Sequence, residues 1–276
     1  MHGSKDLILF LDNGNQYMYD VSITDAIILG IVQGFTEWLP ISSSGHLVIF
    51  QSLLGISVPA AFDIVIMAGT IIALILYFRQ TLFSLARGIV SGDQTALRYC
   101  AFIVIAGTGT ALLGFSGKTF FKGLFYQPFL VSCLIIVTGI FLFIASMAKP
   151  SVGEMTAKKA LVIGIAQGIA VAPGISRSGS TIGAALLLGI KAEDAAVFSF
   201  LIGIPAMTIA SLVTFFEEPA ATVTFAPLAV ATVTAFVTGY ASIGLLMKLL
   251  KENRFIIFAY YCIGAGLLFA FLTYHP

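Results

Sequence analysis

Long apolar stretches separated by short polar segments run through the chain of 276 residues. A helix that crosses a bilayer needs about 20 mainly apolar residues. Uninterrupted stretches of about this length lie near 60–78, 99–116, 128–148, 195–215, 224–247 and 255–274. This pattern predicts six membrane-spanning helices in an all-α polytopic membrane protein.

Two further apolar regions, near 23–56 and 157–190, are interrupted in the middle by Pro, Gly and Ser. The first contains Leu-Pro-Ile-Ser-Ser-Ser-Gly at 39–45, and the second contains Pro-Gly-Ile-Ser-Arg-Ser-Gly at 173–179. Each half of these regions is too short to cross the membrane comfortably. We therefore expect two re-entrant helix hairpins, each entering and leaving on one side.

The two interrupted regions also repeat one another. Gly-Ile-Val-Gln-Gly at 30–34 aligns without a gap with Gly-Ile-Ala-Gln-Gly at 164–168, and the same offset pairs Gly69 with Gly203. So many matches at one offset indicate an internal repeat. The prediction is one membrane domain, 1–276, in which repeat one covers about 22–148 and repeat two about 156–275. Each repeat holds one hairpin, 23–56 or 157–190, and three spanning helices.

Three spanning helices is an odd number, so the second repeat is expected to be inverted relative to the first. Positive charge supports this orientation, because 10 of the 14 Lys and Arg residues fall in loops that would then be cytoplasmic, near 79–98, 149–159, 191–194 and 248–254. The positive-inside rule then places both termini on the outer face. The first hairpin dips in from outside and the second from the cytoplasm.

Composition argues against a soluble protein and against a nucleic-acid-binding protein. Hydrophobic residues make up 59% of the chain and charged residues 10%, whereas a soluble domain is about 25% charged. The net charge of +1 provides no basic surface for nucleic acid.

The three cysteines lie far apart in apolar stretches, and we interpret them as packing residues. Met1 to Asp20 is interpreted as a polar leader.

Few ionisable groups remain at membrane depth, and they gather in the hairpins: Glu37 and His46 in the first, Arg177 in the second. Each costs at least about 2.5 to 3.5 kcal/mol to insert, so their presence needs a reason. A buried ion pair of Glu37 with Arg177 that only locks the hairpins together is the structural alternative.

Gln33 and Glu37 are four residues apart and share one face of a helix. This face is suited to hold a divalent cation or a proton. Gln167 occupies the place of Gln33 in the second repeat, where no carboxylate follows at Val171. Gln33 is therefore also explained as a structural hydrogen-bonding residue.

Serines and glycines stand where the second half-helix of each hairpin should begin. Helix N-termini with such residues bind anions through backbone N–H groups and the helix dipole. Together with Arg177, the two helix N-termini predict a pocket for phosphate. The alternative is that the serines only cap the two helices and bind no ligand. The predicted substrate-binding residues are Gln33, Ser42, Ser44, Gly45, Ser176, Ser178, Gly179, Ser180 and Thr181.

Cleavage of a bound phosphate needs a nucleophile and a group that accepts its proton. Ser43 or Ser44 is a candidate nucleophile, and His46 lies within a few residues of both. A histidine that only joins helices is the alternative for His46. We expect in-line attack on phosphorus, with His46 or Glu37 as the base, or with His46 itself as the nucleophile.

The run Gln-Gly-Phe-Thr-Glu-Trp-Leu-Pro-Ile-Ser-Ser-Ser-Gly-His-Leu at 33–47, with Pro-Gly-Ile-Ser-Arg-Ser-Gly-Ser-Thr at 173–181, resembles the bacitracin-resistance family of undecaprenyl pyrophosphate phosphatases. The likeness covers nearly the whole chain from about residue 22. It implies a plasma-membrane enzyme that removes the terminal phosphate from a polyprenyl diphosphate, so that the carrier lipid is reused in cell-wall and surface-polymer synthesis.

The resemblance carries roles over to single residues. Glu37, Ser43, His46 and Arg177 fall on the family's catalytic positions, and Gln33 stands where many members have glutamate. A requirement for Mg²⁺ or Ca²⁺ is also implied by the resemblance. Glu37 is the candidate metal ligand, with Gln33 as a second and weaker position, and the diphosphate would share in holding the ion.

A transporter or flippase of polyprenyl phosphate is the alternative function, because inverted repeats with broken helices are typical of transporters. Such a carrier would need Arg177 but no nucleophile beside a base, so His46 distinguishes the two. Glycines at 107, 109, 264 and 266 would allow close helix packing within one chain or in a homodimer.

Overall fold

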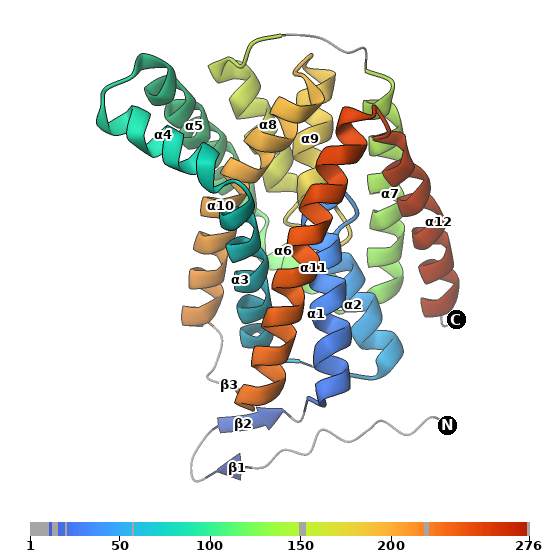
Figure 1. Cartoon of the computed structure of the whole chain (residues 1–276). Helices are drawn as coiled ribbons and strands as arrows, with labels where there is room; N and C mark the ends of the chain where they lie inside the picture. Colours follow the sequence, from blue (N-terminus) through green and yellow to red (C-terminus); the bar gives the residue numbers. More distant parts are fainter. Residues whose placement is uncertain are drawn as a thin grey trace.

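The computed structural model describes residues 11–12, 16–19, 21–56, 58–148, 153–217 and 221–274. This part of the chain is almost entirely helical, as the apolar pattern predicts (Figure 1). Five helices are long and apolar enough to cross a membrane, and a bent pair raises the number to six if it counts as one span. The chain is therefore a multi-pass membrane protein.

The long helices occupy the predicted apolar stretches. They are α3 (Ala60–Tyr77), α5 (Gln94–Ser116), α7 (Pro128–Ser146), α10 (Ala192–Glu217), α11 (Phe225–Lys251) and α12 (Ile256–Thr273). Their outer faces carry exposed large apolar side chains such as Ile72, Leu112 and Phe271. Because lipid tails are as apolar as these side chains, their exposure carries no penalty in a bilayer.

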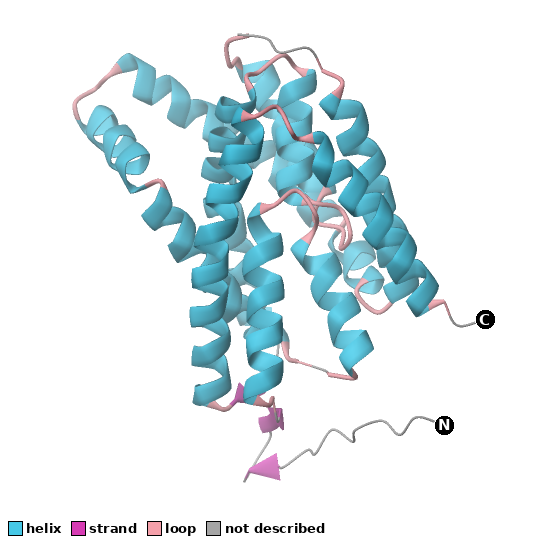
Figure 2. Ribbon diagram, turned by 45° about the vertical axis from the view of Figure 1, so that its right-hand side comes forward, coloured by secondary structure: helices cyan, strands magenta, loops and turns pink. Residues whose placement is uncertain are grey.

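Both interrupted regions contain the predicted sequence of helix, break and helix. The first consists of α1 (Ile23–Trp38) and α2 (Ser43–Leu54), and the second of α8 (Ala157–Ile169) and α9 (Arg177–Leu187). In Figure 1, α1 and α2 lie in the lower half of the bundle and α8 and α9 in the upper half. Figure 2 shows loops in the middle of the molecule where these helices break.

Proline and glycine set the position of the two breaks. Pro40 disfavours a helical conformation at the residue before it, and Leu39 is extended, with φ −70° and ψ 147°. In the second break Gly174 has a φ of 93°, a conformation that a residue without a side chain adopts at low cost. The Ser42 hydroxyl accepts a hydrogen bond from the Gly174 amide at 3.1 Å, so the two breaks touch.

Each hairpin packs closely on a long helix from the other half of the sequence. Helix α1 packs on α11, and α8 packs on α5. A Cβ atom at Gly164 would overlap the carbonyl oxygen of Ala106, and one at Gly34 would overlap the carbonyl oxygen of Ala235. The first half of each hairpin is therefore held by backbone contacts that only glycine permits.

The glycines singled out in α5 and α12 divide into two kinds. A Cβ at Gly109 would lie 3.0 Å from the amide of Ile165 and one at Gly266 3.0 Å from the amide of Ile136, so these glycines join helices within one chain. Gly107 and Gly264 face open space. A homodimer stays a prediction.

Segment 79–98 was expected to be a loop, and this is wrong. It contains α4 (Arg79–Val90), which bends by 73° from α3, and the first residues of α5. Polar residues interleaved with apolar ones at helical spacing lower the mean hydropathy of α4, so an apolar window does not detect it. A further short helix, α6 (Lys118–Leu124), precedes α7.

A small sheet was not predicted by the all-α assignment. It consists of β1 (Leu11–Asp12), β2 (Gln16–Tyr19) and β3 (Ala221–Val223). Strand β2 pairs antiparallel with β1 and parallel with β3, with Tyr17 opposite Ala221. The rest of the expected leader, with Lys5, lies outside the described residues, as does Lys149.

Candidate active site

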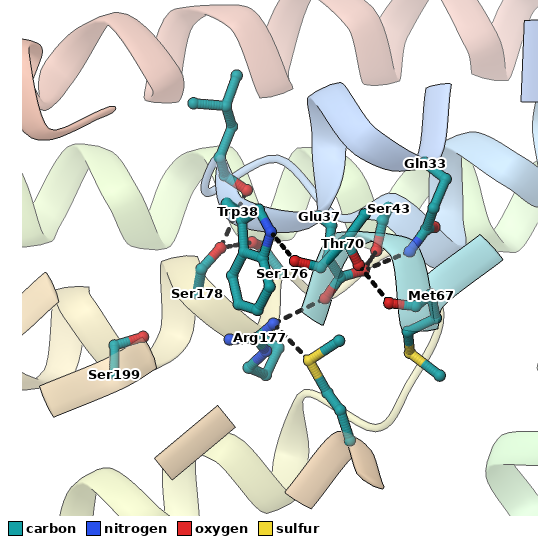
Figure 3. A network of polar contacts seen from close by, with 12 residues as sticks. Gln33, Glu37, Trp38, Ser43, Met67, Thr70, Ser176, Arg177, Ser178 and Ser199 are labelled. Atoms are coloured by element: carbon teal, nitrogen blue, oxygen red, sulfur yellow. Dashed lines mark hydrogen bonds and ion pairs between the residues drawn. The ribbon is translucent and has the colours of Figure 1, made fainter. Parts of the chain in front are cut away.

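Glu37, in the last turn of α1, is the centre of the polar network in the interior (Figure 3). Its Oε1 lies 2.7 Å from Arg177 Nη2, so the ion pair joins the first hairpin to the second. Its Oε2 accepts hydrogen bonds from Ser43 Oγ at 2.6 Å and from Gln33 Nε2 at 3.0 Å. The carboxylate therefore contacts both a cation and a hydroxyl.

Arg177 is the first residue of α9, and its guanidinium is held on several sides. Nη2 also lies 2.9 Å from Met207 Sδ, and the guanidinium carbon lies 4.8 Å from the centre of the Trp38 ring. A Cβ at Gly203 would come within 2.5 Å of Nη1. Nη1 is buried and has no hydrogen-bond partner in the described part of the chain. One terminal guanidinium nitrogen is thus held by Glu37, and the other has donor groups without an acceptor.

Trp38 fixes the plane on which the guanidinium rests. It is fully buried, its Nε1 donates to the carbonyl oxygen of Thr70 at 3.2 Å, and its ring meets Phe200 edge to face. An arginine above a fixed indole face gains a cation–π attraction of roughly 0.5 to 2 kcal/mol.

The N-termini of α2 and α9 have the same capping hydrogen bond. Ser42 Oγ accepts from the Gly45 amide at 3.3 Å, and Ser176 Oγ accepts from the Gly179 amide at 3.0 Å, which are both N-cap hydrogen bonds. The next residue in each helix is Ser43 or Arg177. The predicted serine and glycine clusters therefore begin the two helices, and their first residues meet at Glu37.

Several predicted substrate-binding hydroxyls are already used within the protein. Ser178 donates to the carbonyl oxygen of Leu39 at 2.9 Å, and Thr181 donates to the carbonyl oxygen of Arg177 at 2.9 Å. The Ser180 amide donates to the Ser176 carbonyl oxygen at 2.8 Å. Ser44 is half-buried in the first turn of α2. These residues lie in the first half of α2 or α9, and their binding role stays a prediction.

His46 lies close in sequence to Ser43, but its side chain makes hydrogen bonds elsewhere. Its Nδ1 is 2.8 Å from the carbonyl oxygen of Ser42, and its Nε2 is 3.0 Å from the hydroxyl of Tyr261. A carbonyl oxygen only accepts, so Nδ1 carries the proton and Nε2 accepts from tyrosine in a neutral ring. The hydroxyl of Ser43 instead donates to Glu37.

Some residues around the site were not predicted. Three of them come from distant helices and belong to no sequence motif: Met207, Thr70 and Tyr261. Trp38 lies within the motif at 33–47 but was given no role. Gly203 had one signal, its repeat-related pairing with Gly69.

The site residues do not form a metal cage by themselves. No group of three or more His, Cys, Asp or Glu residues that could hold a metal ion occurs in the described ranges. Both oxygens of Glu37 already have donors, and Gln33 uses its amide nitrogen on Glu37. A divalent cation would therefore need most of its oxygen ligands from a bound molecule.

Fold and site together define a multi-pass membrane protein with a buried centre of serine, carboxylate and arginine. The model of the family described as "Bacitracin resistance protein BacA" matches residues 26–268, and the chain belongs to this family. A protein of Syntrophotalea carbinolica named undecaprenyl-diphosphatase is 42% identical over 260 residues, which cover 91% of this chain and 99% of that protein. One of the same name from Korarchaeum cryptofilum is 36% identical over 259 residues, covering 90% and 98%.

The ion pair predicts a strong coupling between two substitutions. Arg177→Met leaves Glu37 buried without its cation, which typically costs about 3 to 5 kcal/mol. We expect this variant to melt well below the wild type in detergent, and Glu37→Gln combined with Arg177→Met to recover a large part of the loss. Melting temperatures of the wild type, both single variants and the double variant measure the coupling. Additive losses would contradict it.

Proposed function

We propose that the protein hydrolyses undecaprenyl diphosphate to the monophosphate and inorganic phosphate. The observation that carries this proposal is the Ser43 hydroxyl bonded to Glu37 at 2.6 Å, while Arg177, on the other oxygen of Glu37, keeps Nη1 free as a donor. Glu37, the proposed base, thus contacts both the proposed nucleophile and the arginine that would bind the anion. The names of the relatives support the choice of substrate.

Ser43 attacks the terminal phosphorus in the proposed mechanism, and Glu37 Oε2 accepts the hydroxyl proton. The bond from this phosphorus to the bridging oxygen breaks, and undecaprenyl monophosphate leaves with the electron pair and takes up the proton. Ionised Glu37 then accepts a proton from water, and the water oxygen attacks the phosphoserine phosphorus. The bond from this phosphorus to Ser43 Oγ breaks, phosphate leaves, and Glu37 returns the proton to Ser43 Oγ. Arg177 Nη1 and the N-termini of α2 and α9 stabilise the charge on the phosphoryl oxygens.

Two features favour Ser43 over His46 as the nucleophile. Ser43 is half-buried and bonded to a carboxylate, whereas His46 is 1% exposed and both ring nitrogens are engaged. Release of the monophosphate carrier would return it to cell-wall and surface-polymer synthesis. Resistance to bacitracin would be in keeping with the family description.

A divalent cation, Mg²⁺ or Ca²⁺, is proposed to enter with the diphosphate rather than reside in the protein. The protein offers Glu37 as the carboxylate nearest to the bound head group, and diphosphate oxygens would complete the coordination. The ion would neutralise part of the diphosphate charge. Gln33 would act by orienting Glu37, to which it donates at 3.0 Å.

The proposed membrane arrangement is six spanning helices and two re-entrant hairpins in an inverted repeat, with both termini and the site opening on the outer face. The opposed positions of the two hairpins in Figure 1 support it. Equivalent contacts support it too, because α1 packs on α11 as α8 packs on α5. The cytoplasmic side would then carry Arg79 and Arg87 of α4.

Phosphate release tests the proposed function. Purified wild type in detergent should release phosphate from undecaprenyl diphosphate, and Ser43→Ala or Arg177→Lys should lower kcat by roughly 10³-fold or more, because each removes a group acting on the reacting phosphoryl. Ser116→Ala, an exposed serine at the end of α5, is the matched control with wild-type activity. No release by folded wild type would refute hydrolysis and favour a lipid-phosphate carrier.

Cation dependence separates an ion brought by the substrate from a resident one. We expect EDTA to abolish phosphate release and added Mg²⁺ or Ca²⁺ to restore it. Isothermal titration of the substrate-free protein with Mg²⁺ should show no binding below the millimolar range, because Glu37 is the single carboxylate at the site. Micromolar binding without diphosphate would show a protein-held site instead.

Accessibility of introduced cysteines tests the orientation. In a variant whose three native cysteines are replaced by serine, Ser116→Cys should react with a membrane-impermeant maleimide added to intact cells. Ser91→Cys, in the turn between α4 and α5, should react only after permeabilisation. The reverse pattern would place the termini and the site opening on the cytoplasmic face.

A further inference from the structure

We propose that Tyr261 and His46 form a positioning pair that holds a strained turn and thereby aims Ser43 at Glu37. The inference rests on the proposed function and assigns a role to Tyr261, which comes from α12, far from the hairpin in sequence. In this role His46 acts through the backbone of Ser42 and does not take the proton of Ser43.

Ser42, the residue before Ser43, has an unfavourable backbone conformation. Its φ is 71° and its ψ 92°, and apart from Asn253 it is the only non-glycine residue of positive φ in the described segments. Such a conformation costs of order 1–3 kcal/mol and persists only where the surroundings enforce it. Ser176, at the same position of the second hairpin, has an ordinary φ of −75°. The strain is thus confined to the hairpin that carries the nucleophile.

The hydrogen bonds of Ser42 show what enforces this conformation. Its carbonyl oxygen accepts from His46 twice, from Nδ1 at 2.8 Å and from the backbone amide at 3.1 Å. Its hydroxyl accepts from the amides of Gly45 and Gly174. The imidazole is therefore the one side chain that donates to the Ser42 carbonyl oxygen. This carbonyl belongs to the peptide group that joins Ser42 to Ser43.

Tyr261 fixes the imidazole in turn. Its hydroxyl lies 3.0 Å from Nε2, and the two rings are nearly parallel, with 13° between their planes. Phe269, about two turns further along α12, meets the imidazole edge to face. With Tyr261 donating to Nε2, the ring must present Nδ1–H to Ser42, so the tyrosine selects the tautomer that the turn requires.

The same contacts explain why His46 is a poor base for Ser43. A neutral imidazole has one lone pair in the ring plane, and here Tyr261 occupies it. The Ser43 hydroxyl already donates to Glu37 at 2.6 Å. A positioning role requires only the Nδ1–H donor, and another donor placed there should replace it.

The test uses two pairs of variants and steady-state kinetics of phosphate release. Tyr261→Phe should lower kcat about tenfold with KM within twofold, because the part-buried hydrogen bond to His46 is lost. Tyr261 is 44% exposed, so the fold should tolerate the change. Tyr260→Phe, which alters a neighbouring tyrosine that faces Phe143, is the control and should match the wild type.

The second pair replaces His46. Asn places an amide N–H near the position of Nδ1, so His46→Asn should keep at least a tenth of the wild-type kcat, whereas His46→Ala should lose 100-fold or more. Melting temperatures establish that each variant is folded. His46→Asn as inactive as His46→Ala, or Tyr261→Phe as active as the wild type, would overturn the positioning pair alone. A wild type without phosphate release would overturn the proposed function first.

Discussion

The contact between the two helix breaks determines everything else in the site. Glu37 and Arg177 lie 2.7 Å apart only because the end of α1 and the start of α9 meet inside the bundle. Broken helices in a membrane leave backbone groups that lipid cannot satisfy, and here the breaks satisfy each other. The Ser42 hydroxyl accepts from Gly174, and Ser178 donates to Leu39. Each break therefore relies on the other to satisfy its backbone groups.

The repeat alignment shows how the two hairpins divide the chemistry. The offset that pairs Ser42 with Ser176 also pairs Ser43 with Arg177, so the proposed nucleophile and the cation are the first residues of corresponding helices. Glu37 corresponds to Val171, an apolar residue, so only the first hairpin supplies a carboxylate. One carboxylate contacts both corresponding residues, because the two breaks touch. A symmetric pair of sites would need a second acid, which the second hairpin lacks.

Local signals in the sequence predicted most of the helices and the residues at the two breaks. Apolar length located the spans, Pro40 and Gly174 located the breaks, and serine clusters located the helix starts. Amphipathic α4 and the sheet strands were missed, because neither has a long apolar run. The hydrogen-bond partners of the His46 side chain could not be predicted from the sequence either. Its partner Tyr261 lies 215 residues away, and nothing local distinguishes that tyrosine from Tyr260 beside it.

A structural lock alone does not explain this geometry. A buried ion pair that served only to join the hairpins would be most stable with every donor satisfied and the backbone relaxed. Instead Arg177 keeps Nη1 buried without a partner, and Ser42 stays at a φ of 71°. Both features cost free energy, and both occur beside Glu37, which contacts Arg177 and Ser43, the residue after Ser42. In the proposed function, an anion bound at Nη1 would remove the first cost and the strained turn would aim Ser43 at Glu37. The same ion pair would then join the hairpins and prepare the site for phosphate.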